Sequence, residues 1–179
     1  ERERPSSPTV YFREVDSVGH SAGPESMEVL AAAARLDALV GALVAGVDRL
    51  GLANRVNYVV VSDHGMSQLS ADRSIFIDDY LDMNTVDVVE FTPVLQVLPR
   101  SGSADVIYRA LKGRHPALTV YKREEKPLHL RYRSNARIPP IIGLADDGWT
   151  ITQRSRLSLR PAGRGGDHGY DPYYRSMHG

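Results

Sequence analysis

The feature that most constrains this sequence is one long helical pattern set between two strand-like runs. Five apolar side chains recur at alternating steps of four and three residues and so share one face of a helix: Leu36, Val40, Leu43, Val47 and Leu50. Ser26 is suited to cap the start of such a helix, and Gly51 is suited to end it. The pattern therefore predicts a single long helix in the first third of the chain.

The runs on either side of this helix have the composition of strands. Thr9 to Val15 reads as a short apolar strand, and the Gly- and Pro-containing segment from Asp16 to Pro24 reads as the loop that follows it. Asn57 to Val61 is a continuous β-branched and aromatic run, which is typical of a strand covered on both faces. Strand, helix and strand in this order favour a parallel unit.

The second half of the chain is rich in short strand patterns, and the whole therefore reads as an α/β protein. We expect strands at Ser74 to Ile77, Val86 to Glu90, Pro93 to Leu98, Leu118 to Arg123, Leu128 to Arg131, Ile141 to Ala145 and Trp149 to Gln153. A short helix is expected from Ala104 to Gly113, and a Gly-rich loop from Gly163 to Pro172.

Charge and cysteine content exclude several classes of protein. The 22 Lys and Arg residues balance 22 Asp and Glu residues, whereas proteins that coat nucleic acids or bind membranes through basic patches carry excess positive charge. The chain has no Cys, which excludes disulfides, thiolate zinc sites and cysteine nucleophiles. Any metal ion must therefore be held by His and carboxylate groups.

The ends and the apolar content of the chain also give expectations. The most apolar stretch, Leu36 to Leu50, is interrupted by Asp37 and Asp48 and looks too short to cross a bilayer, so we expect no membrane span. The first residue is Glu rather than Met, and the opening residues have no signal-peptide pattern. We therefore expect a piece of a longer protein.

Three short segments place His close to a carboxylate beside glycine, and they are the candidates for chemistry. They are Asp16-x-x-x-His20, Asp63-His64-Gly65 and Asp167-His168-Gly169. Two of them follow predicted strands, and ligands of open parallel sheets bind outside the carboxyl ends of the strands. Any one segment alone is more often a turn in which Asp caps backbone N–H groups, but three together favour a shared site.

Imidazole and carboxylate ligands without sulfur indicate catalytic zinc first, with manganese or iron as alternatives. Asp16, His20 and His168 supply the three protein ligands that a catalytic zinc ion usually has. Asp63 and His64 are neighbours, so they converge on one ion only where the chain leaves strand geometry, which Gly65 permits.

Counting candidates indicates that the site is incomplete in this chain. These five ligands are too few for two ions that each need about three, so a second site lacks at least one ligand. No recognisable Ser, Thr or Cys nucleophile motif and no P-loop occurs either. Both deficits predict further sequence upstream. The remaining internal histidines, His115 and His129, are expected at the surface.

Three blocks of the sequence resemble the nucleotide pyrophosphatase/phosphodiesterase family of the alkaline phosphatase superfamily. The blocks are Tyr11-Phe-Arg-Glu-Val-Asp16-Ser-Val-Gly-His20-Ser-Ala-Gly-Pro24, Val60-Val-Ser-Asp63-His64-Gly-Met66 and Gly166-Asp167-His168-Gly-Tyr170. The resemblance implies an alkaline-phosphatase-like α/β fold, with a mostly parallel sheet flanked by helices, of which residues 1–179 form the C-terminal portion of one catalytic domain. It also implies a two-zinc hydrolase that cleaves phosphodiester or pyrophosphate bonds through a covalent phospho-threonine intermediate.

The resemblance also implies a role for each matched residue. Asp16, His20 and His168 match the ligands of one zinc ion, and Asp63 and His64 match two ligands of the other. The remaining Asp and the nucleophilic Thr belong to the N-terminal half, so no catalytic nucleophile is expected in this chain, and the fragment alone is expected to be inactive. Tyr11 matches an aromatic residue that stacks on a nucleotide base.

Partners and alternatives follow from the same resemblance. It implies a small-molecule nucleotide or phosphodiester substrate, no nucleic-acid polymer, and an exported or membrane-anchored protein. Val15 departs from the family, in which many members have Pro. Two other interpretations stay open: another hydrolase of the superfamily, acting on phosphomonoesters, phosphonates or choline phosphodiesters, or a non-catalytic metal-binding fragment.

Overall fold

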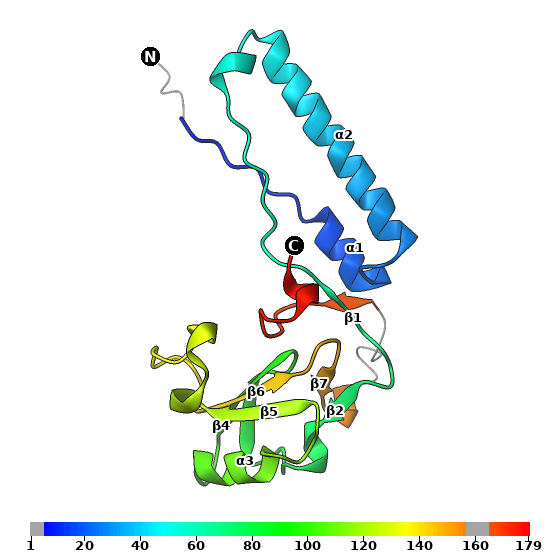
Figure 1. Ribbon diagram of the computed structural model, residues 1–179. Helices are drawn as coiled ribbons and strands as arrows, with labels where there is room; N and C mark the ends of the chain where they lie inside the picture. Colours follow the sequence, from blue (N-terminus) through cyan, green and yellow to red (C-terminus); the bar gives the residue numbers. More distant parts are fainter. Residues whose placement is uncertain (1–5, 157–164) are drawn as a thin grey trace.

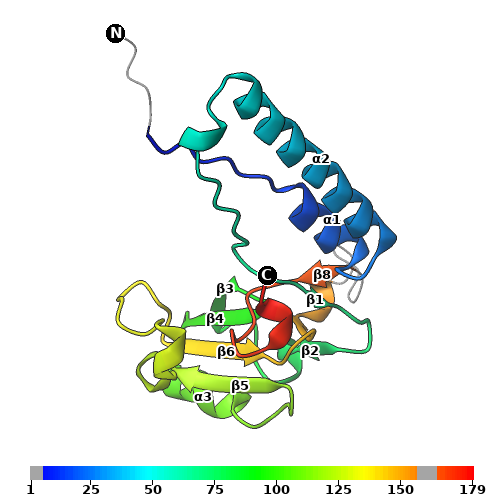
Figure 2. The same ribbon diagram turned by 45° about the horizontal axis from the view of Figure 1, so that its top comes forward.

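The computed structural model describes residues 6–156 and 165–179 (Figure 1). Two helices, α1 (Glu14–Ala22) and α2 (Met27–Arg49), lie side by side at one end of the molecule. Most of the strands and the third helix, α3 (Ala104–Leu111), form the other end (Figure 2). The carboxyl end of the chain returns to lie between these two parts, next to α1.

The long helix forms where the sequence predicts it. Ser26 caps it, because its Oγ accepts a hydrogen bond of 3.2 Å from the backbone N–H of Val29. The helix ends at Arg49, and Gly51 follows in a left-handed conformation with φ of 70°. Most of α2 is exposed, and Ala32 is its one buried residue.

The length of α2 corrects one expectation. The helix spans 23 residues, and its most apolar window has a mean hydropathy of 1.8, so by length and composition alone it could cross a membrane. The expectation considered only Leu36 to Leu50 and so underestimated the length of the helix, which begins at Met27. Core helices of soluble proteins pass the same test of length and composition, so the finding by itself decides little.

The two strands predicted around α2 are wrong, and so is the loop predicted after the first. Asp16 to Ala22 lie in α1, and Thr9 to Arg13 are not in a strand. A short 3₁₀ helix, η1 (Ala53–Arg55), follows α2, and the run that contains Val59 to Val61 has no strand partner among the described residues. These three valines are 82–83% exposed. A strand requires a neighbour for its N–H and C=O groups, so the predicted parallel unit does not form among the described residues.

A four-stranded antiparallel sheet holds most of the core. Its strands are β3 (Val86–Glu90), β4 (Val94–Pro99), β6 (Ile141–Ala145) and β5 (Leu118–Lys122), in the spatial order β3-β4-β6-β5. Alternate residues of β4, Leu95 and Val97, are fully buried, as the two-residue period of a strand requires. The buried side chains Ile107 and Leu111 of α3 belong to the same core. These five elements lie within two residues of their predicted bounds.

Two smaller sheets connect this core to the helices. β2 (Ser74–Phe76) pairs in parallel with β7 (Thr150–Thr152), and β1 (Ser67–Gln68) pairs antiparallel with β8 (Gly166–Asp167). Among the described residues, β2 and β7 are therefore the parallel pair. The strand predicted at Leu128 to Arg131 is a 3₁₀ helix, η4 (Leu128–Leu130), and Gly163 and Arg164 of the predicted Gly-rich loop lie outside the described residues.

Candidate metal centre

Helix α1 presents Asp16 and His20 on the same face, one turn apart. Residues four apart on a helix are neighbours, and Nε2 of His20 lies 3.5 Å from Oδ1 of Asp16. Nδ1 of His20 lies 2.9 Å from the backbone oxygen of Gly166. Because a carbonyl oxygen can only accept, Nδ1 is the donor in this contact, and Nε2 is the ring nitrogen that faces Asp16.

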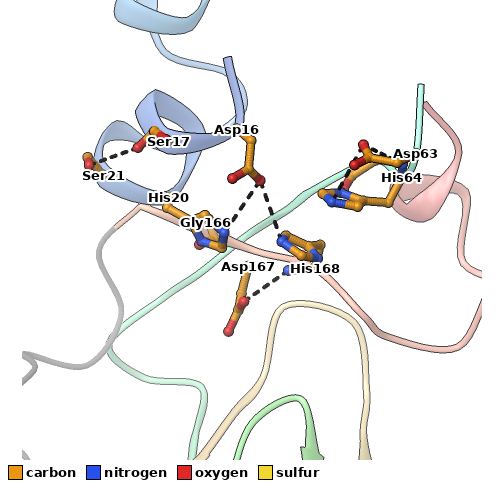
Figure 3. A network of polar contacts seen from close by, with 10 residues as sticks. Asp16, Ser17, His20, Ser21, Asp63, His64, Gly166, Asp167 and His168 are labelled. Carbon is orange, nitrogen blue, oxygen red and sulfur yellow. Dashed lines mark hydrogen bonds and ion pairs between the residues drawn. The ribbon is translucent and has the colours of Figure 1, made fainter. Parts of the chain in front are cut away.

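The pairing of β1 with β8 brings His64 and His168 together. Ser67 is opposite Asp167 in the antiparallel register, so the residues before β1 lie beside those that follow β8. The rings of His64 and His168 stack, with centroids 3.6 Å apart. Nε2 of His168 lies 3.5 Å from Oδ1 of Asp16, which joins this pair to α1 (Figure 3).

The electrostatics of this cluster suit a cation. Oδ1 of Asp16 is buried and has no hydrogen-bond partner. Burial lowers the pKa of His168, and the neighbouring imidazoles of His64 and His20 lower it further. Neutral imidazoles offer lone pairs rather than charge, and Asp16, His64 and His168 can each place one donor atom within 4.8 Å of the others. An unpaired carboxylate oxygen beside neutral imidazoles is a donor set that fits a divalent metal ion.

Glycines allow α1 to approach β8 this closely. A Cβ at Gly165, where φ is 78°, would overlap the backbone carbonyl of His20. A Cβ at Gly166 would lie 2.6 Å from Sδ of Met66, and one at Gly19 would lie 2.5 Å from the same atom. Sequence reasoning missed this role of the glycines, although the Gly-Gly pair before Asp167 is a signal for close backbone approach.

The comparison with protein families decides the classification. Residues 1–171 match the family model of type I phosphodiesterase / nucleotide pyrophosphatase. This chain belongs to that family.

Curated and solved members of the type I phosphodiesterase family resemble the chain closely. Human ectonucleotide pyrophosphatase/phosphodiesterase family member 5 is 38% identical over 169 residues, which are 94% of this chain and 35% of that protein. Human bis(5'-adenosyl)-triphosphatase ENPP4 is 40% identical over 172 residues, which are 95% of this chain and 36% of that protein. The chain thus spans about a third of these relatives.

The solved structures confirm the fold class. Murine ectonucleotide pyrophosphatase / phosphodiesterase 5 superposes with a TM-score of 0.84 at 40% identity, and the match covers 91% of this chain and 43% of that one. The fold is alkaline-phosphatase-like α/β, as the resemblance implies, and this chain covers part of it. The expected mostly parallel sheet is not present among the described residues, where β2 and β7 pair in parallel and the other strand pairs are antiparallel. An inactive Thr-to-Ala variant of the same murine protein has been solved in complex with AMP.

Asp63 lies at the margin of the cluster, whereas no contact among the described residues places Tyr11 in it. The Asp63 side chain is 60% exposed, and its Oδ1 lies 3.6 Å from Nε2 of His64 and accepts a hydrogen bond from the backbone N–H of His64. Tyr11 precedes α1 and is 73% exposed. Gly65 adopts no positive φ, and a Cβ on it would collide with the backbone around Met177, so this family member uses Gly65 for close packing.

A network of two hydroxyls and a carboxylate joins β1 to the carboxyl end of the chain, and sequence reasoning missed it. Ser67 Oγ and Ser176 Oγ both donate to Oδ1 of Asp147, the latter at 2.7 Å. These residues come from three distant segments and match no motif, so no signal in the sequence pointed to them.

The expectation that His115 and His129 are surface residues is wrong. His115 is partly buried and packs edge-on against Trp149, with ring centroids 4.9 Å apart. His129 is also partly buried and is paired with Asp171. Neither is a free surface residue.

Proposed function

We propose that this chain is the C-terminal portion of the catalytic domain of a two-zinc nucleotide pyrophosphatase/phosphodiesterase. In this assignment Asp16, His20 and His168 hold one zinc ion, and Asp63 and His64 supply two ligands of the second. The observation that carries the proposal is the buried, unpartnered Oδ1 of Asp16 within 3.5 Å of Nε2 of both His20 and His168. Residues from opposite ends of the chain meet there, which a loop cap would not require.

Each side chain has a definite part in the proposed reaction. The carbonyl of Gly166 holds the proton of His20 on Nδ1 and so directs Nε2 toward Asp16. Burial, together with the neighbouring imidazoles of His64 and His20, lowers the pKa of His168 and so favours its neutral form, and Asp16 provides the negative charge. When bound, the two zinc ions supply Lewis-acid stabilisation of the phosphate charge and activate the oxygen nucleophiles.

The nucleophile of the proposed reaction is a threonine outside this chain. Its hydroxyl oxygen bonds to phosphorus as the leaving oxygen departs, and water then hydrolyses the phospho-threonine ester. The inactive Thr-to-Ala variant of the murine relative supports this assignment. The exposure of Val59 to Val61, at 82–83%, supports the view that these residues pack against further sequence. Residues 1–179 alone are accordingly expected to be inactive.

The proposed substrate is a small nucleotide or another phosphodiester. Support comes from the AMP complex of the murine relative and from the diadenosine triphosphatase name of the human relative. Tyr11, which is 73% exposed, is available to stack on a base.

Metal content and ester preference together test this function in the full-length protein. We expect about two zinc ions per chain by elemental analysis and faster hydrolysis of bis(p-nitrophenyl) phosphate than of p-nitrophenyl phosphate. His168→Ala should remove one zinc ion and lower the diester rate at least about a hundredfold, since a lost ligand costs more than a lost outer partner. His115→Ala is the matched control and should retain both ions. A metal-free wild-type protein would refute the proposal, and a preference for monoesters would favour another hydrolase of the superfamily.

A further inference from the structure

Residues 169–178, here called the return segment, connect two histidines of the candidate centre. The segment leaves β8 immediately after His168, and Tyr170 anchors it in the core, where its hydroxyl donates to the backbone oxygen of Trp149 at 3.0 Å. Its far end reaches the neighbourhood of His64, because the backbone N–H of Gly65 donates to the oxygen of Met177 at 3.0 Å. A shift of the return segment therefore moves both imidazoles.

His129 holds the middle of the return segment from outside. Its Nε2 lies 2.9 Å from Oδ2 and 3.2 Å from Oδ1 of Asp171. Its ring stacks on Tyr173, with centroids 4.3 Å apart and an angle of 21° between the planes. Oδ1 of Asp171 also accepts a hydrogen bond of 3.0 Å from the backbone N–H of Tyr173, so one carboxylate ties the turn to η4.

Asp171 lies three residues after His168, so the contact between His129 and Asp171 bears on the position of His168. Gly169 follows His168 with φ of 97°, has no side chain of its own to fix it, and is flexible unless its neighbours are held. The side chains of His129 and Asp171 are only 24% and 23% exposed, so their contact is less screened than that of a surface pair. β8 fixes His168 on one side, and Asp171 fixes it on the other.

We propose that His129 is a positioning residue for the metal centre, which acts through Asp171 to hold the return segment and thereby the ring of His168. This inference rests on the proposed zinc-binding function. His129 needs no direct contact with the ion or the substrate, and its effect is on how well the ligands are preorganised.

Zinc affinity of the full-length protein, measured by competition with a chromogenic chelator, tests the proposal. His129→Ala should weaken the affinity about tenfold, at the lower end of the range for lost supporting partners. Asp171→Asn keeps the acceptor for Tyr173 and should weaken it by a similar factor. The double variant should bind zinc no more weakly than either single variant, because the two residues act through one contact. His129→Gln retains a donor at nearly the same reach and should recover most of the affinity.

A control separates positioning from general stability. Val120→Ala removes buried volume from β5 and should lower the melting temperature without changing zinc affinity. Unchanged affinity in His129→Ala and Asp171→Asn, with tight binding by the wild type, would overturn this inference and leave the proposed function intact. Failure of the wild type to bind zinc would overturn both.

Discussion

Nδ1 of His20 lies 2.9 Å from the backbone oxygen of Gly166, a residue 146 positions further along the chain. The contact fixes the tautomer of one candidate ligand through the backbone of the strand that leads to another. It forms because Gly165 and Gly166 leave room for the backbone of α1 to lie against β8. The candidate centre therefore depends on backbone packing as much as on its donor atoms.

The first prediction concerns that packing. Gly165→Ala should destabilise the protein by about 3 kcal/mol or more, because a Cβ there meets the carbonyl of His20 as well as an unfavourable φ of 78°. Gly102→Ala is the matched control: φ is 76° but the surrounding space is open, so only about 1–2 kcal/mol of backbone strain is expected. Urea unfolding of the two variants measures the difference, and equal losses would contradict the packing argument.

The second prediction separates metal binding from folding at Asp16. Asp16→Asn should reduce zinc affinity roughly a hundredfold or more, since it removes a charged ligand. The stability of the metal-free protein at pH 8 should change by less than about 1 kcal/mol, because relief of the unpartnered Oδ1 offsets the loss of negative charge in the first turn of α1.

Titration with zinc and thermal unfolding in chelator measure the two effects of Asp16→Asn separately. Glu14→Gln, which breaks an exposed ion pair with Arg35, is the control. It should change the zinc affinity and the stability of the metal-free protein only slightly. A large loss of metal-free stability with unchanged zinc affinity would assign Asp16 a structural role.

The third prediction concerns a buried amine outside the centre. Lys126 is 1% exposed, its Nζ has no hydrogen-bond partner, and it lies 4.0 Å from the centre of the Tyr132 ring. Burial, with repulsion from Arg123, lowers the pKa of Lys126 to about 8 from 10.5. Between these two pH values the unfolded chain binds the extra proton, so this group makes the free energy of unfolding rise with pH.

Replacing this lysine should remove that pH dependence. Lys126→Met should raise the free energy of unfolding at pH 7 by about 2 kcal/mol, and the gain should shrink as the pH rises from 8 toward 10.5. Urea unfolding at pH 7, 8.5 and 10 measures the gain. The exposed Lys112→Met should show no such trend. A gain that stays constant across these pH values would show that the ammonium is not the cause.

The fourth prediction concerns the exposed apolar surface. Val59, Val60 and Val61 are 82–83% exposed, and Leu43 of α2 is 47% exposed, so the 179-residue chain should bind an environment-sensitive hydrophobic dye strongly. Val60→Lys combined with Leu43→Lys should reduce the dye fluorescence. Val106→Lys, at an isolated exposed position on α3, should leave it unchanged. Equal reductions in both variants would indicate that the dye binds elsewhere.

Sequence patterns predicted the long helix correctly, because its hydrogen bonds and its cap lie within one segment of the chain. α2 has its cap at Ser26 and a regular apolar face, so it formed as expected. α1 was missed because its nine residues include Gly19 and lead into Gly23 and Pro24, which read as a loop. The run at Asn57 to Val61 has the composition of a strand, but pairing depends on a neighbour that composition does not supply.

The candidate centre was predictable in its residues but not in its assembly. His beside carboxylate and glycine marked Asp16, His20, His64 and His168 from the sequence. Their meeting depends on the register of β1 with β8, which two-residue strands do not reveal. The tie between His129 and Asp171 was invisible for the same reason, because η4 and the return segment are distant in the sequence.

The union of α1 with β8 also sets an order for biosynthesis. Asp16 and His20 leave the ribosome well before His168, so they face it only once β8 has been translated. Until then the nascent chain contains Asp16 and His20 without the imidazole of His168. If Asp16, His20 and His168 hold a metal ion as proposed, that ion binds with all three ligands only after β8 has been made.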